Sequence, residues 1–313
     1  MLHSRSNAMA EAVHTEARFN DEDAAREHLE SVYWPKGPIC PHCGGTERNT
    51  RLNGTAHRSG LLYCADCKMQ FTVTVGTVFE RSKVPLHKWV YATHLMCASK
   101  KGISAKQLER MLGVTYKTAW FMAHRIRAAM NIEPKGQLGG NNPVEVDETY
   151  WGNVGKQKPG ARGYDHKMKI VSLVERDGEK RSYHVANVTA ATVAPILKAQ
   201  LDQFASLMTD ESKVYTKVGK TFAEHGVTNH SAGQYVDPIR PWIHSNTVES
   251  SFAILKRGLY GTFHSVSEQH LQRYATEFDF RWNTRQKLGF NDADRAAYAL
   301  KNIGGKRLTY RRG

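Results

Sequence analysis

Acidic residues, cysteines and long apolar runs are all scarce in this sequence of 313 residues. Thirty Asp plus Glu stand against 44 Lys plus Arg, which gives a formal net charge of +14. This balance favours a polyanionic partner, with nucleic acid as the first candidate and a membrane surface as the second. No apolar run approaches the ~20 residues that span a bilayer, and the polar start lacks the apolar core of a signal peptide. We therefore expect a soluble, intracellular protein with no membrane partner.

Only five cysteines occur, which argues against a disulfide framework. Four of them form two Cys-x-x-Cys pairs, Cys40 with Cys43 and Cys64 with Cys67, separated by twenty residues. Four thiolates can close a tetrahedron around one Zn²⁺ and leave no open position for catalysis. We therefore expect a structural zinc ribbon, in preference to reduced core thiols or a redox pair. Cys97 lies in an apolar helical stretch and is expected to be a buried core thiol.

Helical patterns flank the cysteine pairs. Apolar residues recur at helical spacing from 21 to 33, before Pro35, and again from 85 to 130. Ser104 with Gln107 forms a capping box and Gly113 is a stop signal, which bounds a helix over 104–112. A second helix over 115–130 follows at once, as in a helix-turn-helix; an ordinary helical hairpin with a solvated basic face is the alternative. Its polar residues, which we expect to face outward, are Lys117, Thr118, His124, Arg125 and Arg127, and among them Lys117, Arg125 and Arg127 are the candidates for contact with DNA.

The second half of the sequence predicts a mixed sheet covered by helices. A segment rich in Gly, Asn and Pro at 135–143 is the linker before it. Asp177-Gly178 is a hairpin signal between two of the strands. The expected strands cover 144–150, 169–174, 182–188 and 205–210, with a short helix and strand near 214–222 and 226–230, and the expected helices cover 192–204, 246–259 and 267–283.

These patterns predict five segments along the chain. They are a disordered leader (1–20), a helix with the zinc ribbon (21–80), a helix-turn-helix domain (85–134), an α/β domain (143–290) and a basic tail (291–313).

Three carboxylates occur in contexts that suit metal-dependent phosphoryl transfer. Asp147 and Asp210 each follow a strand-like run, and Glu249 opens a helix seven residues before Lys256. Two hard cations about 4 Å apart can activate an attacking oxygen and stabilise a leaving one, and such ions prefer carboxylate ligands. Each acid alone is weak support, because acids at strand ends are more often solvated termini or caps. The neighbouring acids Glu145, Glu148 and Glu211 are rivals for the same role. Glu249 could instead form a surface ion pair with Lys256 or Arg257. Asn246 is the expected cap of the helix, and together with His244 it could reach a substrate strand.

Three blocks resemble the catalytic blocks of bacterial insertion-sequence transposases of the DDE class, in the branch with an N-terminal zinc ribbon. They are Val144–Tyr150, Thr209–Ser212 and His244–Gly258, and the resemblance spans about residues 20 to 290, including Glu277–Asn283. It implies an RNase H-like fold, two Mg²⁺ or Mn²⁺ ions held by Asp147, Asp210 and Glu249, and DNA contact by Lys256 and Arg257. Some members of this branch have asparagine as the third ligand, so Asn246 is the rival of Glu249; the spacing to Lys256 favours Glu249.

The resemblance implies an enzyme that binds the terminal repeats of its element, cleaves DNA and joins the 3′-hydroxyl ends to target DNA. Its partner would be double-stranded DNA, its working form a homo-oligomer on DNA, and its location the bacterial cytoplasm at the nucleoid. Two rivals share the zinc, the helices and the charge: a non-catalytic DNA-binding regulator, and a structure-selective nuclease that cuts without joining. Mg²⁺-dependent nicking and strand-transfer products distinguish the three.

Overall fold

The computed structural model describes residues 13–140, 142–154, 163–306 and 308, and the chain divides into two compact units. The first unit takes residues 1–98, 105–129 and 292–313, and the second takes 99–104 and 130–291. Most of the expected leader, 1–12, lies outside the described residues, as do parts of the expected tail. No helix in the described ranges is long and apolar enough to cross a membrane.

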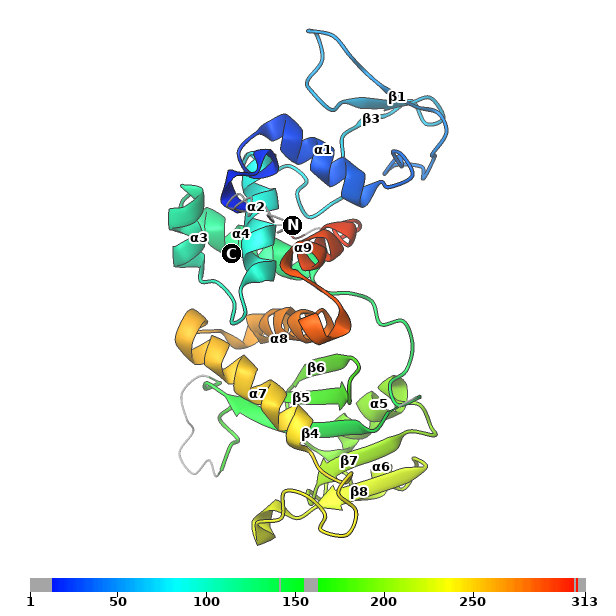
Figure 1. Ribbon diagram of the computed structural model, residues 1–313, viewed down its shortest axis with the longest axis vertical. Coiled ribbons are helices and arrows are strands. Elements are labelled where there is room, and N and C mark those ends of the chain that lie inside the picture. The colour runs from blue at the N-terminus through cyan, green and yellow to red at the C-terminus, as the bar shows by residue number, and fades with distance from the viewer. Residues whose placement is uncertain (1–12, 141, 155–162, 307, 309–313) are drawn as a thin grey trace, which may run out of the picture. The chain divides into compact units, whose positions relative to one another are not determined.

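The first unit combines a small antiparallel sheet with helices. The expected helix at 21–33 is confirmed as α1; Asp21 caps it by accepting a hydrogen bond from Ala24 N at 2.8 Å. Two 3₁₀ helices precede it (Figure 1). The elements of this unit are η1 (Val13–Thr15), η2 (Ala17–Phe19), α1 (Glu22–Tyr33), β1 (Asn49–Arg51), β2 (Leu62–Cys64), β3 (Gln70–Phe71), α2 (Leu86–Ala98), α3 (Ala105–Leu112), α4 (Tyr116–Ala129) and α9 (Asp292–Lys301).

Helices α3 and α4 are joined by the three-residue turn 113–115, so both expected helices and the short turn between them are present. The expected outward faces are wrong for three residues of α4. His124, Arg125 and Arg127 are only 0%, 6% and 2% exposed, whereas Lys117 is exposed. The cause is that α4 packs against α2, α3 and α9, so its second half is surrounded. Arg125 donates hydrogen bonds to the carbonyl oxygens of Glu80 and Leu308.

The second unit contains a five-stranded mixed sheet of order β6-β5-β4-β7-β8. The first three strands are antiparallel neighbours, while β7 runs parallel to both β4 and β8. This order and orientation confirm the RNase H-like α/β fold. The elements are β4 (Val144–Trp151), β5 (Met168–Glu175), β6 (Lys180–Val185), α5 (Ala190–Gln200), β7 (Ser206–Asp210), α6 (Thr216–Gly219), β8 (Glu224–Thr228), η3 (His230–Ala232), α7 (Asn246–Gly258), η4 (Leu259–Phe263), α8 (Glu268–Asn283) and η5 (Gln286–Leu288).

Each face of this sheet packs against its own helices. Even-numbered residues of β4 such as Val144 and Val146 join a core with α5 and α6. The opposite face, to which Trp151 belongs, packs on α7 and α8, and α7 runs obliquely across the strands in Figure 1. The alternation of side chains along a strand therefore places Glu145 and Asp147 on the face of α7. This confirms the expected separation of Val144 and Val146 from the two acids.

Several element boundaries differ from expectation, among them those of β6 and α5. Strand β6 begins at Lys180 and ends at Val185, not over 182–188, because the tight turn at Asp177-Gly178 lets pairing begin at once. Helix α5 ends at Gln200, four residues before the expected end, and Phe204 is 82% exposed. Helical spacing beyond Leu201 thus has no core to face.

Candidate active site and zinc centre

The four paired cysteines converge in the first unit. Their sulfurs all lie within 4.8 Å of one another, with 3.6 Å between Cys40 and Cys67 and 3.7 Å between Cys43 and Cys64. A tetrahedral site with Zn–S bonds of about 2.3 Å has sulfur–sulfur edges of about 3.8 Å. The cluster therefore fits one zinc ion with four sulfur ligands. The expected burial of Cys97, outside the cluster, is also confirmed.

Asp147 and Asp210 lie side by side in the second unit because their strands are parallel neighbours. Val144 pairs with Leu207 and Glu145 with Met208. Continuing this register by two residues places Asp147 opposite Asp210, with both side chains on the face of α7. The register of the sheet, not the distance in sequence, thus brings the two acids together.

The electrostatics of Asp147 show a crowded group of acids. Burial, the neighbouring carboxylate of Glu148 and, to a smaller extent, those of Asp210 and Glu249 together raise the pKa of Asp147 to about 8, against one hydrogen bond from Glu148 N. Burial also raises the pKa of Asp210, as does Glu211, while Ser212 N and His230 oppose the rise. A site that holds like charges together at partial burial favours a proton or a cation.

Glu249 lies in the first turn of α7, and its carboxylate meets His230 from the end of β8. His230 Nε2 is 3.4 Å from Glu249 Oε1, and Ser245 Oγ donates to the same oxygen at 3.1 Å. The side chain of Glu249 is 38% exposed, so it remains accessible to a ligand. Sequence reasoning missed His230, because it lies in no motif and reaches the acids only through the fold.

The three rival acids have other partners. Glu148 faces the opposite side of the sheet and accepts a hydrogen bond from Tyr215 Oη at 2.6 Å. Glu211 accepts the backbone N–H groups of His230 and Ser231, and these bonds with its own N–H lower its pKa to about 2. Glu145 is fully buried and is bonded to the start of α7. Each rival is therefore bonded to a distant segment of the chain, whereas Asp147 and Asp210 accept hydrogen bonds from N–H groups only one and two residues further along.

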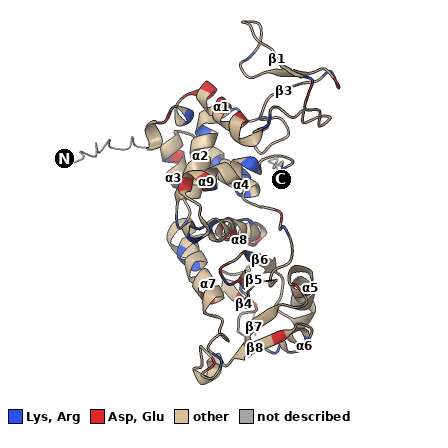
Figure 2. Cartoon of the chain, turned by 45° about the vertical axis from the view of Figure 1, so that its right-hand side comes forward, with Lys and Arg blue, Asp and Glu red and all other residues tan. Residues whose placement is uncertain are grey.

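The remaining candidates lie on α7. Asn246 is the first helical residue and is exposed, while Ser245 occupies the cap position, so the expected cap is wrong by one residue. Asn246 is not needed as the cap because the Glu145 carboxylate, on β4, accepts the N–H groups of Thr247 and Val248. Lys256 and Arg257 lie in the last turn of α7, where Lys256 is half-buried and Arg257 is exposed. The basic residues of this helix appear blue in Figure 2.

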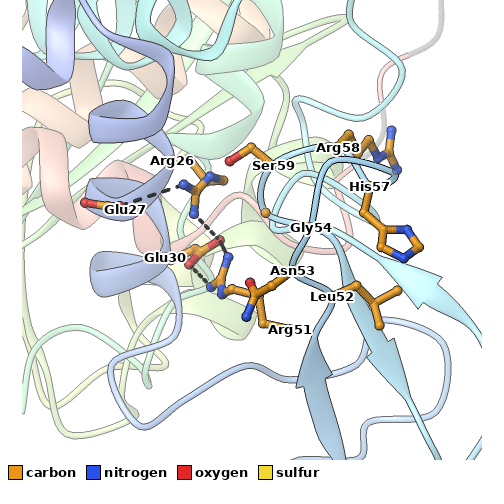
Figure 3. A pocket seen from close by; sticks show the side chains of 11 residues that line it. Arg26, Glu27, Glu30, Arg51, Leu52, Asn53, Gly54, His57, Arg58 and Ser59 are labelled. Atoms are coloured by element: carbon orange, nitrogen blue, oxygen red, sulfur yellow. Dashed lines mark hydrogen bonds and ion pairs between the residues drawn. The ribbon is translucent and has the colours of Figure 1, made fainter.

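A hollow in the first unit has a volume of about 480 Å³ and lies between α1 and residues 51–60 (Figure 3). Two of the three arginines that line it, Arg26 and Arg51, are already paired with acids. Arg26 lies 3.5 Å and Arg51 2.5 Å from Glu30, and Arg26 also lies 2.9 Å from Asp23. This neutralisation leaves little net charge for an anion, so the site on the sheet remains the principal candidate.

The fold and site define an RNase H-like α/β protein with a zinc ribbon, and comparisons with known proteins identify its family. The family model for an ISXO2-like transposase domain matches residues 137–283, and the model for a transposase zinc-ribbon domain matches residues 20–70. The chain belongs to the transposase family that these two models describe. This confirms the resemblance to insertion-sequence transposases with an N-terminal zinc ribbon.

A relative from Halobacterium salinarum, described as an uncharacterized protein in transposable element ISH50, is 27% identical over 289 residues. The match covers 87% of this chain and 94% of the relative. Two solved structures of Mos1 also match, both at 14% identity: the strand transfer complex (TM-score 0.23, 62% of this chain and 76% of that one) and a paired-end complex with the left transposon end (TM-score 0.22, 68% and 79%).

Proposed function

We propose that this transposase cleaves DNA at the ends of its element and joins the freed 3′-hydroxyl to target DNA, with Asp147, Asp210 and Glu249 as its acidic site. The observation that carries the proposal is the parallel register of β4 and β7, which, continued by two residues, brings Asp147 opposite Asp210. Glu249 is close enough to contribute to the raised pKa of Asp147. Membership of the transposase family supports it. DNA is the partner that the net charge of +14 favours.

The donor set suits Mg²⁺ or Mn²⁺, because three carboxylates offer hard oxygen ligands and their mutual repulsion would be relieved by cations. When bound, two such ions would activate the attacking oxygen and stabilise the leaving one. Among the described residues, only the cysteines bring three or more metal-ligating side chains together as a ready-made group. The three carboxylates do not form such a ready-made group. We assign them as the ligands on their chemistry and expect them to move closer together when the ions bind.

Cleavage needs an oxygen of water to attack the phosphorus while the bond to the 3′-oxygen breaks, which leaves a 3′-hydroxyl and a 5′-phosphate. Joining repeats the exchange, with the 3′-hydroxyl as the attacking group. In this proposal Lys256 and Arg257 bind phosphates beside the acids, since they continue the helix that carries Glu249. Lys117, at the exposed start of α4, binds a phosphate of the terminal repeat; the buried Arg125 and Arg127 are not retained as contacts.

The test uses DNA that carries the terminal repeats beside the gene, with Mg²⁺ and the full-length protein. We expect nicks at the repeat ends and strand-transfer products from the wild type. An Asp147→Asn variant should bind this DNA with unchanged affinity and show no cleavage; cleavage by that variant contradicts the proposal. Nicks without joined products would indicate a nuclease, and binding without nicks a regulator.

The same assay decides the third ligand. Glu249→Gln should abolish cleavage, whereas Asn246→Ala should retain it, because Glu249 alone presents a carboxylate toward the other acids. The reverse result would assign the role to Asn246.

A further inference from the structure

We propose that Glu145 and Arg176 are positioning residues that fix the distance between the two sides of the acidic site. The inference deepens the proposed function and rests on it. Glu145 lies two residues before Asp147 on the same face of β4, and its carboxylate is bonded to the residues immediately before Glu249. One side chain thus connects the strand that carries the first acid with the helix that carries the third.

The Glu145 carboxylate is fully buried and has a donor for each of its oxygens. Oε2 accepts the backbone N–H groups of Thr247 at 2.7 Å and Val248 at 2.9 Å. Oε1 accepts the Thr247 hydroxyl at 2.8 Å and Arg176 Nε at 2.6 Å. The first N–H groups of a helix have no partner within the helix, and a negative charge is favoured there. Glu145 therefore caps the start of α7, since the side chain of the cap residue, Ser245, accepts no hydrogen bond from the helix.

Arg176 fixes the loop that leads into α7. Besides Glu145, its guanidinium donates to the carbonyl oxygens of Trp242 at 2.6 Å and His244 at 2.9 Å. Its own backbone N–H donates to Pro143 O at 3.0 Å, at the start of β4. Arg176 thus connects the loop before α7 with the residue before β4. Three directed donors on one rigid group make this a connection that lysine cannot reproduce.

The consequence for the site is geometric. Glu249 follows Val248 directly, so a shift of the first turn of α7 along β4 moves the Glu249 carboxylate relative to Asp147 by the same amount. Partners that orient metal ligands without touching the ion typically change metal affinity 10–100-fold when they are removed. The pair should therefore control how tightly the acidic site holds its cations, beyond what it adds to folding.

A second buried carboxylate in the same unit gives a matched control. Asp279 of α8 accepts Ser182 N and Ser182 Oγ, both at 2.7 Å, and lies 3.7 Å from Lys180. It fastens a helix to the edge of the sheet by the same chemistry, but at β6, away from the three acids. Loss of this carboxylate should reduce stability and leave the acidic site unchanged.

The experiment measures Mn²⁺ binding to the DNA-free protein by calorimetry and titrates Mg²⁺ in the cleavage assay at saturating DNA, both at a temperature where all variants are folded; a shift expected in one should appear in the other. For Glu145→Gln we expect at least a tenfold rise in the Mg²⁺ concentration for half-maximal cleavage, with unchanged DNA affinity. Asp279→Asn should lower the unfolding temperature but keep the wild-type Mg²⁺ concentration. Should Glu145→Gln fail to fold, Thr247→Val removes one bond to Oε1 with the same volume and should shift the Mg²⁺ requirement in the same direction.

Equal Mg²⁺ titrations for the wild type and Glu145→Gln, or an equal shift in Asp279→Asn, would overturn the positioning role while the proposed function stands. If Glu145→Gln does not fold, a wild-type titration for Thr247→Val overturns it instead. Absence of cleavage by the wild type at any Mg²⁺ concentration would overturn the proposed function, and this inference with it.

Discussion

The change Asp147→Asn should stabilise the metal-free protein at neutral pH while it abolishes cleavage. Burial and the surrounding acids raise the pKa of Asp147 from its usual 3.8 to about 8, so the folded state holds a proton that the unfolded chain has lost. Between these values the unfolded state binds fewer protons, and stability therefore falls as pH rises. Asparagine is uncharged, and its side-chain oxygen can still accept the hydrogen bond from Glu148 N.

The magnitude follows from the shift. Each pKa unit corresponds to about 1.4 kcal/mol, so a shift of about four units sets a ceiling of roughly 6 kcal/mol above pH 8 and about 4 kcal/mol at pH 7. Water reaches this half-buried group, so we expect a gain of about 1–3 kcal/mol at pH 7. The gain should be near zero at pH 4 and grow as pH rises toward 8.

The measurement is urea unfolding of both proteins, with the zinc ribbon loaded, in buffer free of Mg²⁺ and Mn²⁺, from pH 5 to pH 9. Glu211→Gln is the control of opposite sign: backbone N–H groups lower the pKa of Glu211 to about 2, so its loss should destabilise the protein at neutral pH. That contribution is present above the usual pKa of about 4.3 and is lost as pH falls through about 2. An Asp147→Asn protein that is less stable than the wild type at pH 7 and above would refute the reasoning.

Three further outcomes are expected. Cys64→Ser should lose the zinc, measured as metal content of the purified protein, and raise amide exchange in residues 39–75, because three remaining thiolates hold a structural ion poorly; full zinc content would contradict the assignment. Gly258→Ala should cost about 1–3 kcal/mol in urea unfolding, since an added Cβ would lie 2.2 Å from a ring carbon of Phe278; no loss of stability would show that the ring can move aside. Arg125→Ala should lower the free energy of unfolding, because Arg125 is buried and bonded to Glu80 O. Lys117→Ala should instead reduce by about one the slope of log affinity for DNA against log salt concentration, because Lys117 is exposed. Equal slopes for the wild type and Lys117→Ala would remove Lys117 from the DNA contacts.

The zinc ribbon, the two helices of the helix-turn-helix and the mixed sheet could be predicted because their signals are local. Cysteine spacing, capping residues and alternation along β4 each concern a few neighbouring residues. The burial of Arg125 could not be predicted, since it depends on helices distant in sequence that surround α4. The pairing of Glu145 with α7 likewise joins residues about a hundred positions apart, and the sequence around Glu145 offered only an acid near Asp147.

Within the site, the sequence predicted the acids but not their partners. Strand-like runs predicted where Asp147 and Asp210 occur, but Asp147 lies in the middle of β4, not at its end, while Asp210 does end β7. Their proximity depends on β4 and β7 being parallel neighbours. His230 has no sequence signal, because it meets Glu249 only where β8 ends beside the start of α7. Arg176 adjoins a predicted hairpin turn, but its three side-chain acceptors lie in two other segments.

Helix α9 has a consequence for the order in which the protein can fold. This helix is near the end of the chain, yet it packs on α2 within the first unit, where Ala299 and Leu300 are buried and Val78 N bonds to Ile303 O at 3.0 Å. Residues 130–291, which form most of the second unit, are therefore synthesised before α9, so the core of the first unit closes only after the second unit has been made. A chain cut before Asp292 should lack the packing of α9 on α2 and leave that side of α2 uncovered.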